Sequence, residues 1–196
     1  MSAETRRIHM ITIGRQFGSG GHKIGEFLAN RLGMPYYDDE LILLTAAELL
    51  TDENEGKNPL FDRTNCSVRE VQKATILELA KREPAVIVGR CADDILKKAG
   101  VPTLSVFIAA PWEQRIARTM RVQGLSRSAV EELTRRKDES RRAFYREVTG
   151  KEWGVPESYD LYYDTSESDI GSIIVDIIRH YKELQKTAKA AGEDGK

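Results

Sequence analysis

The stretch Ile11-Thr-Ile-Gly-Arg-Gln-Phe-Gly-Ser-Gly-Gly-His-Lys-Ile-Gly25 has the pattern of a strand, a glycine-rich loop and a helix. The residues from Ile8 to Ile13 are apolar or β-branched apart from one histidine, which favours a buried strand. Apolar residues then recur at helical spacing, at Ile24, Phe27, Leu28 and Leu32. A loop of this kind points consecutive backbone N–H groups at one spot, where the helix dipole also favours negative charge. The stretch therefore predicts a polyphosphate site.

The loop departs from the standard phosphate-binding pattern G-x-x-x-x-G-K-[ST], whose lysine contacts phosphates and whose hydroxyl contacts magnesium. With Gly20 at the second glycine, Gly21 stands at the lysine position and His22 at the hydroxyl position. Arg15 or Lys23 would then supply the missing cation, and a glycine-rich turn without any ligand is the alternative. We expect the donor nucleotide to contact this set of residues: Gly14, Arg15, Gly18, Ser19, Gly20, Gly21, His22 and Lys23.

Composition limits the kind of protein. The 196 residues, 40% of them hydrophobic, suit a single domain with a proper core. A net charge of -1 gives no electrostatic reason to expect nucleic-acid or membrane binding. The two cysteines, Cys66 and Cys91, lack the spacing of a disulfide scaffold or a zinc site. We expect a cytoplasmic protein with one domain over residues 1–185 and a flexible tail over 186–196, and the sequence leaves its oligomeric state open.

Strand and helix patterns alternate along the chain. We predict strands at about 8–13, 35–37, 85–88, 103–109 and 159–163, and a polar loop at 51–65. Capping-box patterns at Ser67–Glu70 and Ser128–Glu131 predict two helix starts. Further helices are expected at about 40–50, 111–122 and 170–184. The alternation predicts an α/β fold with a five-stranded parallel sheet flanked by helices.

Ligands of parallel sheets bind beyond the carboxyl ends of the strands. This rule places the glycine loop, Asp38-Asp39-Glu40 and Gly89-Arg90 along one edge of the sheet. The three carboxylates suit a hydrated magnesium ion or an acceptor hydroxyl, although at least one is expected to cap the next helix. Arg90 follows a strand-ending glycine and suits a phosphate, with a surface ion pair as its alternative.

The helix predicted at about 131–147 carries six cations: Arg135, Arg136, Lys137, Arg141, Arg142 and Arg146. Asp138 precedes Arg141 and Arg142 by three and four residues, so the three share a face. An ordinary solvated helix with Glu–Arg pairs explains part of this charge. A lid that closes arginines over phosphates explains the rest, and we predict such a lid over about 125–155.

Six motifs, in this order, resemble those of the cytidylate-kinase-like branch of the P-loop nucleoside monophosphate kinases: G-R-Q-F-G-S-G-G-H-K-I-G, Y-Y-D-D-E-L-I, V-I-V-G-R-C-A, S-V-F-I-A-A-P-W-E-Q-R-I-A-R, K-D-E-S-R and Y-D-L-Y-Y-D-T. The resemblance spans about residues 8 to 184. It implies a P-loop kinase fold with a helical lid, and a need for ATP and magnesium.

The same resemblance implies roles for individual residues. Arg90 matches the arginine of the family's G-R-D segment, and Asp38 matches the aspartate after the second strand. Asp138 and Arg141 match the lid pattern D-x-x-R, where the carboxylate reads the base or sugar and the arginine holds the monophosphate. The chain departs from true cytidylate kinases at four positions: Gly21, His22, Val88 and Cys91.

Three functions fit these observations. The first is ATP-dependent phosphoryl transfer to a nucleoside monophosphate, cytidylate-like, or to a related small acceptor. Its catalytic residues would be Arg15, Asp38, Arg90 and Arg141, with Asp38 also the metal ligand. Its substrate-binding residues would be Asp38, Arg90, Asp138, Arg141 and Arg142. The second is a nucleotide-binding sensor or interaction module without turnover, and the third is a small-alcohol kinase of the shikimate type.

Overall fold

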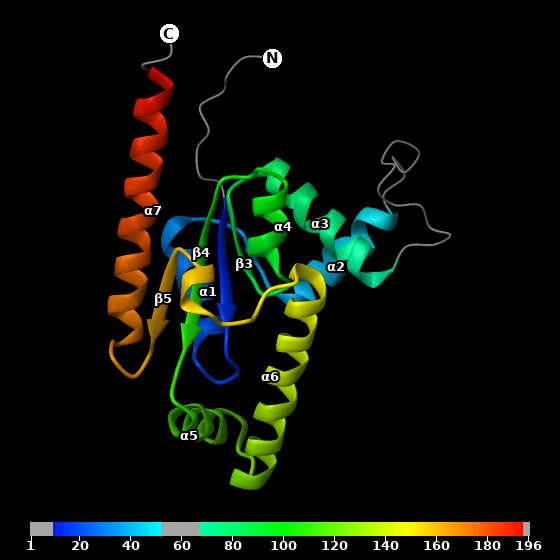
Figure 1. The fold of residues 1–196 in the computed structure, drawn as a ribbon, viewed down its shortest axis with the longest axis vertical. Helices are drawn as coiled ribbons and strands as arrows, with labels where there is room; N and C mark the ends of the chain where they lie inside the picture. The colour runs from blue at the N-terminus through cyan, green and yellow to red at the C-terminus, as the bar shows by residue number, and fades with distance from the viewer. Residues whose placement is uncertain (1–9, 52–66, 194–196) are drawn as a thin grey trace.

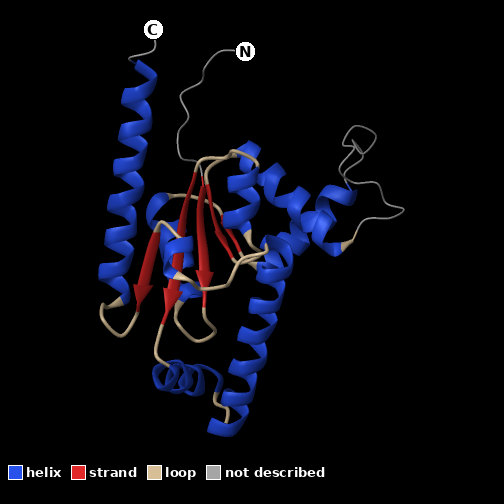
Figure 2. Cartoon of the chain, viewed as in Figure 1, coloured by secondary structure: helices blue, strands red, loops and turns tan. Residues whose placement is uncertain are grey.

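A computed structural model of the chain describes residues 10–51 and 67–193. Its centre is a five-stranded sheet with the order β2-β3-β1-β4-β5, in which every neighbouring pair is parallel (Figure 2). The strands are β1 (Met10–Arg15), β2 (Tyr36–Tyr37), β3 (Ala85–Val88), β4 (Thr103–Ala109) and β5 (Leu161–Asp164). The predicted five-stranded parallel sheet is therefore confirmed.

Helices cover both faces of this sheet. They are α1 (Gly21–Leu32), α2 (Asp39–Thr51), α3 (Val68–Arg82), α4 (Ala92–Lys98), α5 (Trp112–Gln123), α6 (Arg127–Thr149) and α7 (Ile170–Glu193), with a short 3₁₀ turn at Pro156–Ser158. Figure 1 shows α5 and the long α6 extending beyond the carboxyl ends of the strands. Helix α6 lies within the segment 125–155, for which we predicted a lid, and the closure of that segment stays a prediction.

The core follows from the two-residue period of β1. Ile11 and Ile13 pack with Ile24 of α1 and with the apolar stripe of α7. Met10, on the opposite face, packs in the cluster formed by α2, α3 and α4. A strand that is buried on both faces reads as a continuous apolar run, and this explains the composition of the segment that precedes the glycine loop.

Several element boundaries differ from prediction. The capping box at Ser67 is confirmed, because its side chain accepts from Glu70 N–H and Glu70 accepts from Ser67 N–H at 2.8 Å. The one expected at Ser128 is wrong: Ser126 caps α6, with its Oγ 3.4 Å from Ala129 N. The last strand begins at Leu161, because the Asp160 carboxylate accepts the Ser105 N–H at 2.7 Å in place of a backbone carbonyl. Helix α4 was not predicted.

The chain ends differently from the expected tail. Helix α7 continues to Glu193, past residue 186, where we predicted the tail to begin. Residues 52–65 of the predicted loop, and residues 8–9 of the first predicted strand, lie outside the described part of the chain. The division into a domain over 1–185 and a tail stays a prediction. Within the described residues, no helix is both long and apolar enough to cross a membrane.

The close approach of α1 to the sheet at Gly25 gives a test of the fold. A Cβ atom at this position would lie 2.6 Å from Val88 Cγ2 and 3.1 Å from Tyr36 Cε2. We therefore expect Gly25→Val to lower the free energy of unfolding by about 1–3 kcal/mol through overpacking. Asn30→Ala, on the exposed side of α1, serves as the control and should change it by less than about 0.5 kcal/mol. Equal denaturant midpoints for the two variants would contradict this packing.

Candidate active site

The glycine loop joins β1 to α1 and presents free amides. Gly18 and Gly20 have φ angles of 77° and 94°, in the left-handed region that favours glycine. Gly20 is the N-cap of α1, and the Ile24 N–H is bonded to its carbonyl at 3.0 Å. The first-turn amides before Ile24 have no acceptor within a helix. The loop therefore has the local geometry of an anion site.

Helix α5 and the turn after β5 hold the loop through its carbonyl groups. Arg118 Nη1 donates to Gly18 O at 2.8 Å, and Thr165 Oγ1 donates to Ser19 O at 3.1 Å. The Ser19 hydroxyl is buried and donates to Gln16 O at 2.8 Å, and the Ser19 N–H lies 3.3 Å from the same carbonyl. Ser19 thus shapes the turn from within, although we predicted that it contacts the nucleotide.

Arg15 occupies the space that a lysine at position 21 would need. A Cβ atom on Gly21 would lie 2.6 Å from Arg15 Cβ and 3.1 Å from Arg15 Cγ. The Arg15 side chain continues across the site, and a Cβ atom on Gly89 would lie 2.0 Å from its Nη1. Arg15 is only 8% exposed, and its Nη2 lies 3.4 Å from Asp39 Oδ2. A buried cation therefore stands beside the loop although the lysine of the usual motif is missing.

Lys23 and His22 lie on the exposed side of α1. The His22 ring contacts Tyr36, with its Nδ1 2.9 Å from Tyr36 Oη, and it lies 3.8 Å from the Asp38 carboxylate. Of the two cations that we considered as the lysine substitute, the structure places Arg15, and not Lys23, inside the site.

The two aspartates after β2 have different positions. Asp38 caps α2, because its Oδ1 accepts from the N–H groups of Glu40 and Leu41, both at 3.0 Å. Asp39 lines the cavity instead, with Oδ2 facing Arg15 and Oδ1 3.3 Å from Arg90 Nε. The catalytic and metal-binding roles predicted for Asp38 stay untested, but the geometry brings Asp39 into the site.

The turn after β3 has an unusual backbone. Gly89, Arg90 and Cys91 have φ angles of 92°, 58° and 54° in succession. Non-glycine residues rarely adopt such angles, and where they do the strain often marks a functional site. The turn directs Arg90 towards Asp39 and over the ring of Phe144, whose centroid is 5.9 Å from the guanidinium carbon. Cys91 is no nucleophile here, because burial raises the pKa of its thiol to about 12.

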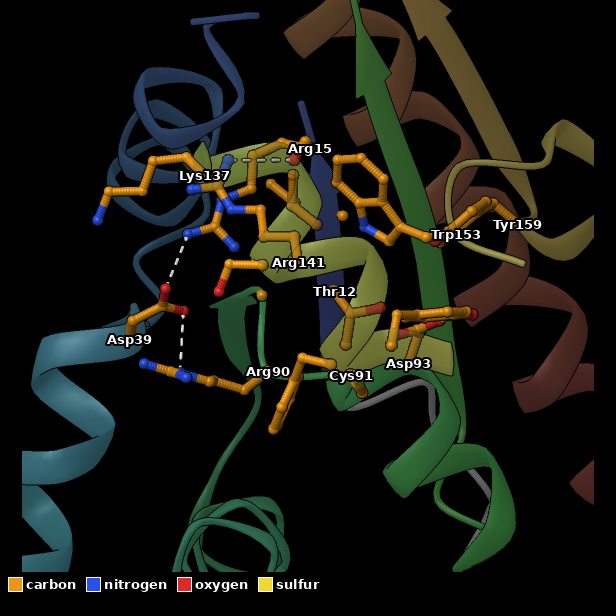
Figure 3. A pocket seen from close by; sticks show the side chains of 16 residues that line it. Thr12, Arg15, Asp39, Arg90, Cys91, Asp93, Lys137, Arg141, Trp153 and Tyr159 are labelled. Carbon is orange, nitrogen blue, oxygen red and sulfur yellow. Dashed lines mark hydrogen bonds and ion pairs between the residues drawn. The ribbon is translucent and has the colours of Figure 1, made fainter. Parts of the chain in front are cut away.

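A cavity of about 230 Å³ lies where these elements meet. Its walls come from the ends of β1 and β3, from the start of α2 and α4, from α6 and from the segment before β5. Figure 3 shows Arg15, Arg90 and Arg141 around Asp39 at one side, and Thr12, Asp93 and the aromatic side chains at the other. Helix α6 contributes one face, through Lys137, Ser140, Arg141, Phe144 and Tyr145.

Arg141 reaches the loop from this helix. Its Nη1 lies 3.5 Å from the backbone carbonyl oxygen of Arg15, and its guanidinium carbon lies 5.7 Å from the ring centroid of Phe17. Burial and the nearby positive charge of Arg15 lower the pKa of Arg141 to about 10. An anion bound between these crowded cations would stabilise their charged forms. The cationic side of the cavity is therefore suited to phosphate.

Two other predicted lid residues lie outside the cavity. The Asp138 carboxylate accepts the Phe17 N–H at 2.7 Å and pairs with Arg115 Nη1 at 2.5 Å, so it ties α6 to the loop. Arg142 is exposed on the other side of α6, with its guanidinium 6.0 Å from the ring centroid of Trp153. The structure thus brings Arg15, Arg90 and Arg141 together in the cavity lining, whereas Asp38, Asp138 and Arg142 do not line it, although Asp138 Oδ1 lies 3.9 Å from Arg141 Nη1.

Sequence reasoning missed the side of the cavity that carries no arginine or lysine. Its residues are Thr12, Asp93, Tyr145, Trp153 and Tyr159. One signal for them was present, because Phe144 and Tyr145 follow Arg141 by three and four residues and must share its helix face. The others come from segments that only the tertiary fold brings together.

Comparison with known proteins identifies the family of the chain. The model of the cytidylate kinase-like family matches residues 10–167. A cytidylate kinase of Methanocaldococcus jannaschii is 23% identical over 165 residues, which cover 84% of this chain and 92% of that protein. Among solved structures, an uncharacterized protein from Eubacterium ventriosum has 26% identity and a TM-score of 0.73, over 88% of this chain and 98% of its own.

More distant structures share the fold. A shikimate kinase from Bacteroides thetaiotaomicron has 19% identity and a TM-score of 0.53, over 88% of this chain and 98% of its own. A gluconokinase from Sinorhizobium meliloti has 17% identity and a TM-score of 0.56, over 95% of this chain and 99% of its own. At these identities the likeness shows the fold alone, which is the P-loop kinase fold. With the family model matching most of its length, the chain belongs to the cytidylate kinase-like family.

Proposed function

We propose that the protein is an ATP-dependent kinase that transfers a phosphoryl group to a nucleoside monophosphate or a related small anionic acceptor. The convergence of Arg15, Arg90 and Arg141 on one cavity beside the glycine loop carries this proposal. Phosphoryl transfer needs cations around the three equatorial oxygens of the transferring group, and this cavity provides them from three separate elements. Membership of the cytidylate kinase-like family supports the same chemistry.

Each group has a place in the reaction. The first-turn amides of α1 and the Arg15 guanidinium bind the donor phosphates. An acceptor oxygen then attacks the γ-phosphorus, and the bond from that phosphorus to the bridging oxygen breaks, which releases ADP. Arg90 and Arg141 stabilise the charge on the transferring group. Asp39, held between Arg15 and Arg90, orients both cations.

Magnesium fits this site in the way common to nucleotide kinases. The ion is usually held by one or two carboxylates together with substrate phosphates and water. Within residues 10–51 and 67–193 there is no cluster of three or more metal-binding side chains, so the ion would depend on the nucleotide. Asp39 is the carboxylate in position to hold the magnesium ion. The bound ion would neutralise charge on the donor phosphates.

The cavity volume favours a second candidate among the acceptors. Pockets for drug-sized ligands measure about 300–1,000 Å³, and this cavity measures about 230 Å³. A compact hydroxyl-bearing acceptor, as in a small-alcohol kinase, fits that volume better than a nucleotide. Asp39 would then accept the hydroxyl proton. A sensor without turnover gains no such support, because Arg15 fills the space of the missing lysine.

Removal of Arg15 tests the donor site. Arg15→Ala should weaken MgATP binding by about 1–3 kcal/mol, since a charge-assisted contact is lost. Isothermal calorimetry measures this, and Lys23→Ala is the control because that side chain is exposed on α1. Normal ATP affinity in Arg15→Ala together with a large loss of ATP affinity in Lys23→Ala would show that Lys23 supplies the cation of the donor site.

Neighbouring arginines on α6 test the acceptor site. We expect Arg141→Ala to raise the acceptor KM and lower kcat, with ATP affinity little changed, because Arg141 lines the cavity. Arg142→Ala should leave both constants close to wild type, because its side chain is exposed outside the cavity. Steady-state kinetics on the two variants decides the matter, and similar losses in both would show that α6 acts as a structural element.

The adjacent aspartates provide a third comparison. Asp39→Asn should lower kcat by on the order of 10–100-fold, the loss expected from about 1.5–3 kcal/mol of charge-assisted contact. Asp38→Asn should retain activity, since asparagine caps a helix as well as aspartate does. Rates of ADP release measure both. The reverse order of effects would return the catalytic role to Asp38, as first predicted.

A further inference from the structure

The cavity has two chemically different ends. Its cationic end is formed by Arg15, Arg90, Lys137 and Arg141 around Asp39. Its other end, which we call the neutral end, is formed by Thr12, Asp93, Tyr145, Trp153 and Tyr159 (Figure 3). The proposed phosphoryl transfer uses the cationic end and leaves the neutral end without a role.

The neutral end contains polar groups that lack partners. Thr12 is 2% exposed, and within the described residues its Oγ1 makes no hydrogen bond. Tyr159 is 8% exposed, and its Oη lies near the Tyr145 hydroxyl and the Gly154 backbone without a hydrogen bond of normal geometry to either. A buried hydroxyl without a partner costs about 1–3 kcal/mol, so native structures rarely retain one without a reason. Both side chains line the same cavity, and a ligand there would satisfy both.

The half-buried carboxyl group of Asp93 stands beside these hydroxyls. Tyr145 Oη donates to Asp93 Oδ2 at 2.9 Å, which fixes the orientation of the carboxyl group. Burial raises the pKa of Asp93. The rest of the wall is aromatic, with the Trp153 ring 5.4 Å from that of Phe107 and the Tyr159 ring 4.9 Å from it. Hydroxyls, one carboxyl group and aromatic faces together suit an uncharged group that both donates and accepts hydrogen bonds.

We propose that the neutral end is a subsite for the uncharged, hydroxyl-bearing body of the phosphoryl acceptor, and that Thr12, Asp93 and Tyr159 determine which acceptor is used. The inference rests on the proposed function. The acceptor is then a compact anion whose charged group lies among the arginines and whose hydroxyls pair with Thr12, Tyr159 and Asp93. Two sources share this chemistry, a nucleoside monophosphate bound through its sugar and a polyhydroxylated carboxylic acid.

Two substitutions test the subsite because they remove a hydroxyl and keep the volume. Thr12→Val and Tyr159→Phe should leave the melting temperature of the free protein unchanged or raise it, since an unpaired buried hydroxyl is removed. Tyr162→Phe is the matched control, because Tyr162 lies outside the cavity and stacks on Phe107 from β5. A clear fall in the melting temperature of both cavity variants would show that their hydroxyls serve the fold, and would overturn the proposal.

Binding is then measured without ATP. The probes are cytidylate, adenylate, shikimate and gluconate, each followed by isothermal calorimetry with the full chain. We expect at least one probe to bind wild type and Tyr162→Phe equally, and to bind Thr12→Val and Tyr159→Phe about 5–10-fold more weakly. The class of the probe that binds identifies the source of the hydroxyls. Absence of binding by all four, or equal binding by all variants, would overturn the subsite.

Turnover with MgATP separates this proposal from the proposed function. ADP release that depends on a probe, with a KM raised in both cavity variants, supports both. Binding that follows the two hydroxyls without any ADP release supports the subsite and contradicts the kinase. ADP release that is insensitive to both substitutions supports the kinase and overturns the subsite.

Discussion

The path of one buried side chain, that of Arg15, constrains the rest of the site. It leaves the end of β1, crosses above Gly21 and reaches Asp39 at the start of α2. A Cβ atom at position 21 would lie against Arg15 Cβ, and one at position 89 would lie against the end of the same side chain, so both glycines leave room for one arginine. The ion pair with Asp39 then fixes where α2 begins relative to β1, and Asp39 in turn holds Arg90. Three strand ends therefore meet around a single guanidinium group.

A second buried ion pair, between Asp138 and Arg115, connects the lid to the glycine loop. Both side chains are mostly buried, and both also bind the backbone of Phe17, through its N–H and its carbonyl. Removing one partner of such a pair typically costs about 3–5 kcal/mol, because the other charge is left buried and unpaired. Movement of α6 away from the sheet must therefore break contacts with the loop itself.

How much of this could be predicted depends on the range of the interactions. The strands, the order of the elements and the glycine loop follow from local periodicity and composition, and the structure confirms them. The choice between Asp38 and Asp39 could not be made, because both are good helix caps and only the path of Arg15 distinguishes them. The partner of Asp138 lies on another helix, and Arg141 and Arg142 differ only in their direction around α6. Such choices are made by tertiary contacts, which no local pattern contains.

The left-handed turn at Gly89-Arg90-Cys91 limits which substitutions can raise the stability of this protein without altering the cavity. Each non-glycine residue in that region costs about 1–3 kcal/mol, and the surrounding structure must offset the cost. Glycine at position 90 or 91 would relieve it, so a selection for thermal stability alone would favour those substitutions. At position 91 the gain is compatible with the site, whereas at position 90 it removes a cation from the cavity. At Arg90, relief of the backbone strain and retention of a positive charge in the cavity therefore oppose each other.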